Sequence, residues 1–327
     1  MVKTEEIFTL TDKLEFEKLA LRVFQYQATN NRVYKEYLEH LKFDISTVKT
    51  LTQIPFLPIN FFKSHKVVST DKKAQAIFTS SGTTENLTSR HYVPDLKIYE
   101  ASFTKGFEQY YGAVNDYCIL ALLPSYLERE GSSLIYMMEK LIKDSKHEKS
   151  GFYLHNHEEL IATIDELKKS GQKILLLGVS FALLDLAEKF QLDLDGVIVM
   201  ETGGMKGRRK EITREELHAL LTKRLGVEKI HSEYGMTELL SQAYSKGDSL
   251  FFTPSWMKIL IRDTYDPFSY EQQGRSGGVN VIDLANINSC SFIETQDLGR
   301  IHANGSFEIL GRFDHSDIRG CNLLVNE

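Results

Sequence analysis

The sequence is poor in cysteine, has no surplus of basic residues and contains no long hydrophobic run. Its 327 residues include three cysteines, Cys118, Cys290 and Cys321, which lie far apart in the chain. An odd, low count without a close pair argues against a zinc site and favours a reducing compartment. The formal net charge is −6. Because nucleic-acid binders usually carry a basic surplus, this charge argues against a nucleic-acid partner, and an anionic ligand must be attracted by a local field.

No apolar run approaches the roughly 20 residues that a membrane-spanning helix requires. The polar start Met1–Glu6 also lacks the apolar core of a signal peptide. We therefore expect a soluble, cytoplasmic protein without a membrane span. Hydrophobic residues make up 42% of the chain and charged residues 26%, which is typical of a globular protein with one large domain or two ordinary ones.

Strand-like apolar runs alternate with helical patterns along most of the chain. Two helices are expected within residues 12–42, and two prolines predict an extended segment at Ile54–Lys63. The expected strands are 76–78, 117–123, 151–154, 173–177, 196–200 and 228–233, and the expected helices are 95–111, 131–143, 158–169, 181–190 and 213–225. Such alternation predicts a largely parallel sheet whose ligands lie beyond the carboxyl ends of its strands.

The last quarter of the sequence changes to short β-like runs with Gly, Asn and Asp between them. These runs are residues 257–261, 278–284, 300–303 and 306–310. A hairpin turn is expected at Ala303–Ser306, A-N-G-S. We therefore predict an α/β protein. A parallel-sheet layered body with a helical N-terminal lead spans residues 1–250, a β-rich subdomain of the same large domain spans 251–311, and a short tail spans 312–327.

The most unusual stretch is a run of small hydroxyl and glycine residues after Ile77 and Phe78. Its members are Thr79, Ser80, Ser81, Gly82, Thr83 and Thr84. Such residues bury little apolar area, so the core does not require them. Their hydroxyls and exposed backbone N–H groups suit a polyphosphate, although the Gly-Lys-Ser/Thr ending of a Walker loop is absent. The alternative is an ordinary surface turn rich in serine and threonine.

Two further loops follow expected strands and carry unusual chemistry. In Thr202–Lys210, Gly203 and Gly204 permit a tight turn and the close approach of a flat ring, beside four basic residues. The alternative is a glycine turn with a solvated basic face. The segment Tyr234–Glu238 contains Tyr234, Gly235, Met236, Thr237 and Glu238. Glu238 could hold Mg²⁺ together with substrate phosphates, whereas the alternative is a strand-to-helix junction with Thr237 as the N-cap.

Two polar residues of the β-rich part complete the candidate site. Asp297 could accept hydrogen bonds from a ribose diol, and Arg312 could reach a ribose or phosphate oxygen. Taken singly, each is more typical of a surface turn.

Together these segments resemble a known superfamily. T-S-S-G-T-T, T-G-G, Y-G-M-T-E, T-Q-D and G-R-F-D occur in the order of the adenylate-forming acyl-activating enzymes. A closer resemblance is to the acyl-protein synthetases of the bacterial luminescence fatty-acid reductase (LuxE-like). It rests on P-S-Y-L-E-R-E-G-S-S-L at Pro124–Leu134, T-G-G-M-K-G-R-R-K at Thr202–Lys210 and R-G-C-N-L-L-V at Arg319–Val325.

The resemblance implies the fold of an adenylate-forming N-terminal domain and a role for each motif residue. Thr79–Thr84 would cradle the β- and γ-phosphates of ATP. Gly203 and Gly204 would line the adenine, and Tyr234 would stack on it. Gly235 and Met236 lie in the same nucleotide-binding motif. Thr237 would bond the α-phosphate, Glu238 would bind Mg²⁺, and Asp297 would hold the ribose with Arg312 nearby.

Two departures from the superfamily and one cysteine qualify this picture. The Pro-Lys pair that ends many glycine-rich loops is missing, and Arg90 or Lys206 is a candidate substitute. Relatives continue past G-R-x-D into a lid with a catalytic lysine, whereas this sequence stops at Glu327. Adenylation is therefore expected to need another cation, a partner subunit or slow turnover. Cys321 corresponds to a thiol that accepts the acyl group in these synthetases, but free cysteine is also commonly a small buried residue.

Three functions fit these residues. The first is ATP-dependent activation of a fatty or other carboxylic acid and transfer to a cysteine, with Thr237, Glu238 and Cys321 in the chemistry and an acyl-protein reductase as partner. The second is an AMP-forming acyl- or aryl-CoA ligase. The third is a non-catalytic scaffold that binds a nucleotide or an acyl group. Cys118 and Cys290 receive no role. His155 and His157 follow an expected strand, where acyl-activating relatives often place a pocket residue, but a structural or exposed histidine is the favoured interpretation.

Overall fold

The computed structural model describes residues 2–80, 88–123, 131–154, 156–204 and 212–313. The longer described helices are α2 (Lys13–Asn30), α3 (Arg32–His40), α5 (Leu96–Tyr111), α6 (Ser133–Ser145), α7 (His157–Ser170), α8 (Ser180–Lys189) and α9 (Arg214–Leu225). Two single-turn helices are α1 (Thr4–Ile7) and α4 (Phe61–Ser64), and the 3₁₀ turn η4 covers Leu284–Asn288.

Among the described residues, twelve strands form one sheet in the order β11-β12-β13-β14-β10-β9-β8-β7-β6-β4-β5, with β1 paired to β13. The parallel strands are β4 (Tyr117–Leu122), β5 (Gly151–Phe152), β6 (Lys173–Val179), β7 (Ile198–Thr202) and β8 (His231–Tyr234). The antiparallel continuation is β9 (Ala243–Ser245), β10 (Phe251–Phe252), β11 (Met257–Arg262), β12 (Ser276–Asp283), β13 (Phe292–Ile301) and β14 (Phe307–Arg312).

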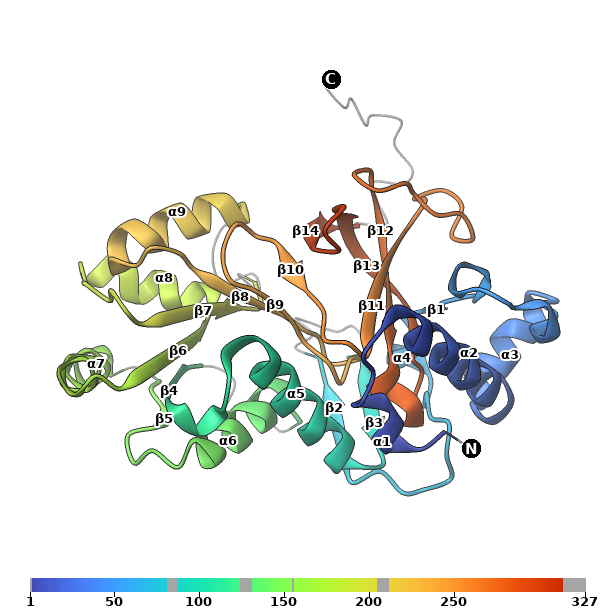
Figure 1. The fold of residues 1–327 in the computed structure, drawn as a ribbon, viewed down its shortest axis with the longest axis horizontal. Coiled ribbons are helices and arrows are strands. Elements are labelled where there is room, and N and C mark those ends of the chain that lie inside the picture. Colours follow the sequence, from blue (N-terminus) through green and yellow to red (C-terminus); the bar gives the residue numbers. More distant parts are fainter. Residues whose placement is uncertain (1, 81–87, 124–130, 155, 205–211, 314–327) are drawn as a thin grey trace.

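Helices cover both faces of the parallel strands. In Figure 1, α8 and α9 lie on one side of β6–β8, and α5 and α6 lie on the other. Every residue of β4 is buried. A strand covered on both faces must be apolar throughout, which explains the continuous run Tyr117–Leu122. The predicted alternation of strands and helices around a parallel sheet is therefore confirmed.

Two helix boundaries follow from local sequence. Asp12 accepts hydrogen bonds from the backbone of Leu14 (2.8 Å) and Glu15 (2.9 Å), so α2 begins after it. Asn31 ends α2 and caps α3 through its side chain, which explains the predicted break. The extended segment predicted at Ile54–Lys63 is correct only to Asn60, because α4 begins at Phe61.

The hairpin of β2 (Ala76–Thr79) and β3 (Arg90–Val93) lies outside the large sheet. Its strands pair antiparallel and form a separate two-stranded sheet. The expectation that the hydroxyl-rich stretch follows a strand of the parallel sheet is therefore wrong. The signal was ambiguous because a short apolar run does not reveal its pairing partner.

The last part of the sheet differs most from the sequence prediction. The short run expected at 300–303 is the end of the ten-residue strand β13. Its polar residues hid the rest of the strand, because Thr295 and Asp297 face inward and are bonded there. The hairpin at Ala303–Ser306 is confirmed: His302 donates to Ser306 O (2.8 Å), and Gly305 has φ +84°.

The two ends of the described chain are joined in the core. β1 (Leu57–Pro58) pairs in parallel with β13. Gln27 of α2 is fully buried and donates to the carbonyls of Asn286 and Ile287, both at 3.0 Å. Asn31 donates to Ser289 O at 2.8 Å. The N-terminal helices therefore belong to the same core as the antiparallel strands (Figure 1).

Candidate functional site

The centre of the site is the turn that follows β8. Leu239 N donates to Met236 O (3.1 Å), and no helix begins at this turn. The alternative that Thr237 is an N-cap is therefore wrong. A Cβ at Gly235 would lie 2.4 Å from the Glu233 carboxylate, so a larger residue here would require that side chain to move. Gly235 is exposed, Met236 and Thr237 are half-buried, and Glu238 is buried.

Tyr234, Asp297 and Arg312 come together from three strands. The Tyr234 hydroxyl donates to Asp297 Oδ2 at 2.7 Å, and Arg312 Nε lies 3.3 Å from Asp297 Oδ1. Burial raises the pKa of Tyr234 well above its ordinary value, and burial also raises the pKa of Asp297. Asp297 is therefore an inward-facing strand residue and not a surface turn. Arg312 remains 71% exposed and is free to meet an anion.

The carboxylate of Glu238 is 6% exposed. Burial raises its pKa, while a hydrogen bond from Ser89, its own backbone, and the positive charges of Arg312 and Lys63 act in the opposite direction. A bound cation would further favour the ionised form. Lys63 is exposed on α4, in a segment that the sequence analysis assigned only to packing.

A cradle of three buried residues, His91, Asp283 and Asn286, holds the backbone of this turn. His91 Nδ1 lies 2.9 Å from Thr237 O, and Asn286 donates to Glu238 O at 2.8 Å. Asp283 accepts from the backbone of Leu240 (3.0 Å) and Ser241 (2.9 Å) and from the Ser241 hydroxyl (2.6 Å). No local pattern in the sequence marks these three residues, because their partners are distant in the chain.

The paired glycines lie beside this turn at the edge of the sheet. Thr202 of β7 is in register with Glu233 of β8, and their side chains are hydrogen-bonded. Gly203 has φ +70°, and a Cβ at Gly204 would meet nothing within 4 Å. Ser180 fixes the turn by donating to Gly203 O at 3.2 Å. Lys206 and the rest of the basic run to Lys210 lie outside the described residues.

Two described residues, Thr79 and Ser80, mark the start of the hydroxyl-rich stretch; Ser81, Gly82, Thr83 and Thr84 lie outside the described residues. Ser80 N donates to Ser89 O (3.1 Å), and Ser89 N donates to Ser80 Oγ (3.0 Å). These bonds close the hairpin at the residue pair from which the stretch departs. Thr79 N also donates to Gly131 O at 2.8 Å.

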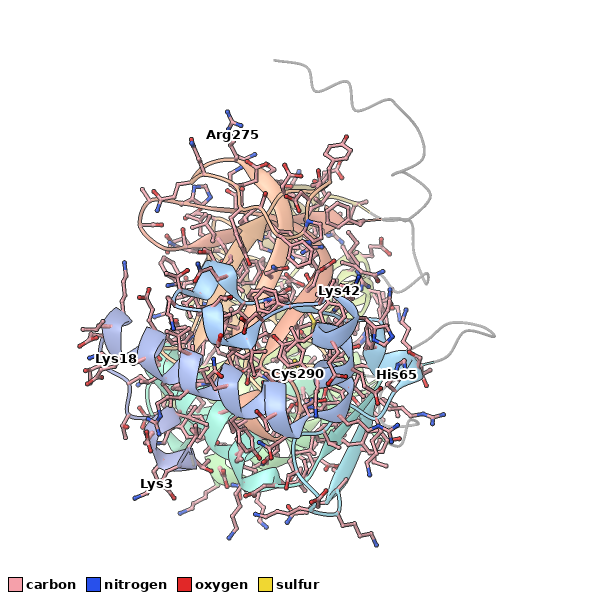
Figure 2. The ribbon with its side chains drawn as sticks, turned by 90° about the vertical axis from the view of Figure 1, so that its right-hand side faces the viewer. Lys3, Lys18, Lys42, His65, Arg275 and Cys290 are labelled. Atoms are coloured by element: carbon pink, nitrogen blue, oxygen red, sulfur yellow. The ribbon has the colours of Figure 1, made fainter. Side chains whose placement is uncertain are left out.

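The described cysteines are unsuitable as acyl acceptors. Cys118 and Cys290 are both fully buried, and burial raises the pKa of the Cys290 thiol to about 12. Figure 2 shows Cys290 inside the molecule, whereas Lys3 and Lys18 point outward at its edge. Cys321 and His155 lie outside the described residues. His157 is buried at the start of α7, where its ring contacts Phe190 edge-on, which agrees with a structural role.

The described part of the chain contains no group of three or more His, Cys, Asp or Glu side chains arranged to hold a metal ion. Among the described residues, a site built on Glu238 would therefore offer at most two such side chains. That donor set suits Mg²⁺, which takes one or two carboxylates and completes its shell with water and phosphate oxygens. Within the same residues, none of the helices combines the length and apolarity needed to cross a bilayer.

A family model described as acyl-protein synthetase, LuxE, matches residues 11–327. No curated protein matches the chain in sequence. Among solved structures, it is similar to ATP-bound MatB from Rhodopseudomonas palustris, with 16% identity, a TM-score of 0.55, and coverage of 75% of this chain and 50% of that chain. The chain thus spans half the length of that relative.

A second similar structure is an open conformation of 2-hydroxyisobutyryl-CoA ligase in complex with 2-HIB-AMP and CoA. The identity is 13%, the TM-score is 0.64, and the match covers 92% of this chain and 71% of that chain. The same ligase in its thioesterification state gives a TM-score of 0.65 at 13% identity, covering 95% and 71%. At these identities the likeness concerns the fold.

Proposed function

Because the chain belongs to the acyl-protein synthetase family, LuxE, whose model matches residues 11–327, we propose that it activates a fatty or other carboxylic acid with ATP and transfers the acyl group to a cysteine thiol. A carboxylate oxygen of the acid attacks the α-phosphorus, and the bond to the pyrophosphate oxygen breaks. A thiolate then attacks the acyl carbon and releases AMP. ATP-bound MatB and the ligase with 2-HIB-AMP support this assignment by analogy.

The single observation that carries the proposal is the junction of Tyr234, Asp297 and Arg312 beside the Thr237–Glu238 turn. The Tyr234–Asp297 bond of 2.7 Å joins residues 63 positions apart, and each belongs to a different motif of the resemblance. Asp297 Oδ2 is contacted by Tyr234, and Oδ1 is contacted by Arg312. Each carboxylate oxygen can accept more than one hydrogen bond, so Asp297 keeps lone pairs for a ribose hydroxyl. Gly203 and Gly204 would lie against the base, and Thr237 would bond the α-phosphate.

Charge neutralisation is the main requirement of this chemistry. Mg²⁺ held by Glu238 would supply it at the phosphates. Arg312 is exposed beside Asp297, and Lys63 acts on the charge of Glu238. Both therefore join Arg90 and Lys206 as candidates for the cation that the loop lacks without its Pro-Lys pair. Thr79–Thr84 would contribute hydroxyl donors. These roles make Glu238 the most sensitive position for a conservative substitution.

Pyrophosphate exchange tests the first step. The wild-type protein is incubated with labelled pyrophosphate, ATP, Mg²⁺ and a series of carboxylic acids of increasing chain length. We expect exchange that depends on the acid and is lost in Glu238→Gln. Lys105→Gln is a control on another element, because Lys105 belongs to α5 and its ammonium lies 5.5 Å from the centroid of the Phe8 ring. Absence of exchange with every acid would exclude adenylation and leave the non-catalytic scaffold.

Acyl labelling tests the second step. The protein is incubated with ATP and radioactive fatty acid without CoA, and the label is followed in wild type, Cys321→Ala and Cys290→Ala. We expect a thioester on the wild type and on Cys290→Ala only, and transfer of the label to an added acyl-protein reductase. Label retained by Cys321→Ala would contradict the acceptor assignment. Consumption of CoA with no protein label would favour the CoA ligase.

A further inference from the structure

The hairpin β2–β3 is attached to the turn after β8 through the strand that returns from the hydroxyl-rich stretch. His91 on β3 contacts Thr237 O at 2.9 Å, and Ser89, two residues earlier, hydrogen-bonds the Glu238 side chain. The hairpin has no backbone pairing with the large sheet in the described residues. These side-chain bonds therefore connect the hairpin to the turn after β8, which the large sheet does not join to it.

The bonding partners of His91 define its tautomer. The Thr237 carbonyl can only accept, so Nδ1 must carry the hydrogen. Nε2 then accepts from the Ser289 hydroxyl at 2.8 Å. His91 is 1% exposed, and the remaining face of its ring meets Phe62 edge-on at 5.5 Å between centroids. Burial lowers the pKa of His91 to about 4, so the ring is neutral near pH 7.

The opposite side of the turn is already fixed. Asn286 and Asp283 bond the backbone of Glu238, Leu240 and Ser241 from η4 and the end of β12. Only the hairpin side depends on His91. A change in the bond from His91 to Thr237 would therefore alter the spacing between the hairpin and Glu238 while the rest of the cradle stays in place.

We propose that His91, as its Nδ1–H tautomer, is a positioning residue that sets the distance between the β2–β3 hairpin and the Thr237–Glu238 turn. The inference rests on the proposed adenylation. His91 is too deeply buried to touch a substrate, so it acts through the Thr237 carbonyl. Supporting residues of this kind typically change metal affinity or activity by about 10- to 100-fold when they are removed.

Two amide variants separate positioning from general stability. In His91→Asn the side-chain amide nitrogen replaces Nδ1 and can still donate to Thr237, whereas in His91→Gln it replaces Nε2. Ser289→Ala, the matched control, removes the partner of Nε2 and a longer contact to Asn286 O at 3.4 Å, and leaves the bond of Nδ1 to Thr237 O. We expect His91→Asn and Ser289→Ala to keep kcat for pyrophosphate exchange within about threefold, and His91→Gln to lose about 10- to 100-fold in kcat at similar thermal stability.

Equal losses of kcat in the two amide variants, or full kcat in His91→Gln, would overturn the inference. A second measurement does not depend on activity: ¹⁵N chemical shifts of histidine-labelled protein, with the His91 signals assigned by their loss in His91→Asn. We expect a neutral ring with the hydrogen on Nδ1, and a hydrogen on Nε2 would refute the geometry. A wild-type protein with no exchange would instead refute the proposed function, even if the tautomer is as expected.

Discussion

Replacing His91 by asparagine is expected to lower the free energy of unfolding by an amount that increases with pH. The pKa of His91 is about 4 in the folded protein and about 6.5 in an unfolded chain. Between these values the unfolded state binds one more proton than the folded state. The neutral histidine therefore contributes to the free energy of unfolding above the unfolded pKa, and this contribution is lost as pH falls towards the folded pKa.

The magnitude follows from the size of the shift. A difference of about 2.5 pKa units at about 1.36 kcal/mol per unit gives about 3 kcal/mol over the window. Thr237 O, Ser289 and Phe62 contact the ring and are all uncharged. Burial lowers the pKa of His91 by more than the hydrogen bond to Thr237 O raises it, so the net shift is downward. The difference between wild type and His91→Asn cancels the titration of all groups that both proteins share.

The assay is urea unfolding followed by the fluorescence of Trp256, the single tryptophan. Its ring is 3% exposed and its indole N–H donates to Ser102 and Ser241, so its emission should respond to global unfolding. The two proteins are compared at several pH values between about 4 and about 7. A difference in stability that stays constant within about 0.5 kcal/mol, or that shrinks as pH rises, would refute the reasoning.

Asp283 provides a control of opposite sign. Burial raises the pKa of its carboxyl to about 6, against hydrogen bonds that favour the ionised form. An acid whose folded pKa is raised contributes stability at low pH that is lost as pH rises through the folded value. The stability advantage of wild type over Asp283→Asn should therefore decrease by about 3 kcal/mol over a similar window. If the stability difference from wild type changed with pH in the same direction for His91→Asn and Asp283→Asn, a change common to both variants, and not the titration of each residue, would dominate.

Three further predictions concern individual positions. Glu238→Gln should reduce pyrophosphate exchange by at least about 100-fold. It should change the free energy of unfolding by less than about 1 kcal/mol, because burial already disfavours the charge of Glu238. A large loss of stability would assign Glu238 a structural role. Tyr234→Phe leaves Asp297 Oδ2 without the Tyr234 hydroxyl as its donor. The substitution should lower the free energy of unfolding in urea by about 1–3 kcal/mol and raise KM for ATP. Unchanged values of both would contradict the hydrogen bond. Gly131 has φ +82°, and a Cβ there would lie 2.9 Å from a carbonyl oxygen, whereas Gly171 has φ +72° and faces open space. Gly131→Ala should therefore lower the stability in thermal unfolding by about 1 kcal/mol or more beyond the loss in Gly171→Ala. Equal losses of stability would contradict the close contact.

The sequence predicted the parallel half of the fold well, because strands such as β4 are buried on both faces and read as continuous apolar runs. It failed where pairing is nonlocal. β3 was missed, and β13 was shortened to its last residues, because Thr295 and Asp297 are polar yet buried. Their partners, Arg262 and Tyr234 among them, come from other strands. Local propensity cannot represent a partner that is distant in the sequence.

The candidate site was predicted unevenly for the same reason. Residues that would touch a ligand stand in motifs after strands, so Tyr234 and Glu238 could be named from the sequence. Residues that hold those motifs in place lie outside such motifs, so the sequence does not mark them. His91 and Asp283 act on this turn through bonds that span 146 and 42 positions, and no spacing rule relates them to it. Only the folded chain reveals them.

The pairing of α2 and β1 with segments far along the sequence also constrains how the protein is made. Gln27 precedes Asn286 by 259 positions, and β1 likewise precedes its partner β13, so these segments are synthesised well before their partners. Until then a buried glutamine and the apolar faces of two helices lack their native covering. The pairing of segments so distant in the sequence is slow, and until it is complete the exposed apolar surface can aggregate. Co-expression of a chaperone should therefore raise the soluble yield of this protein.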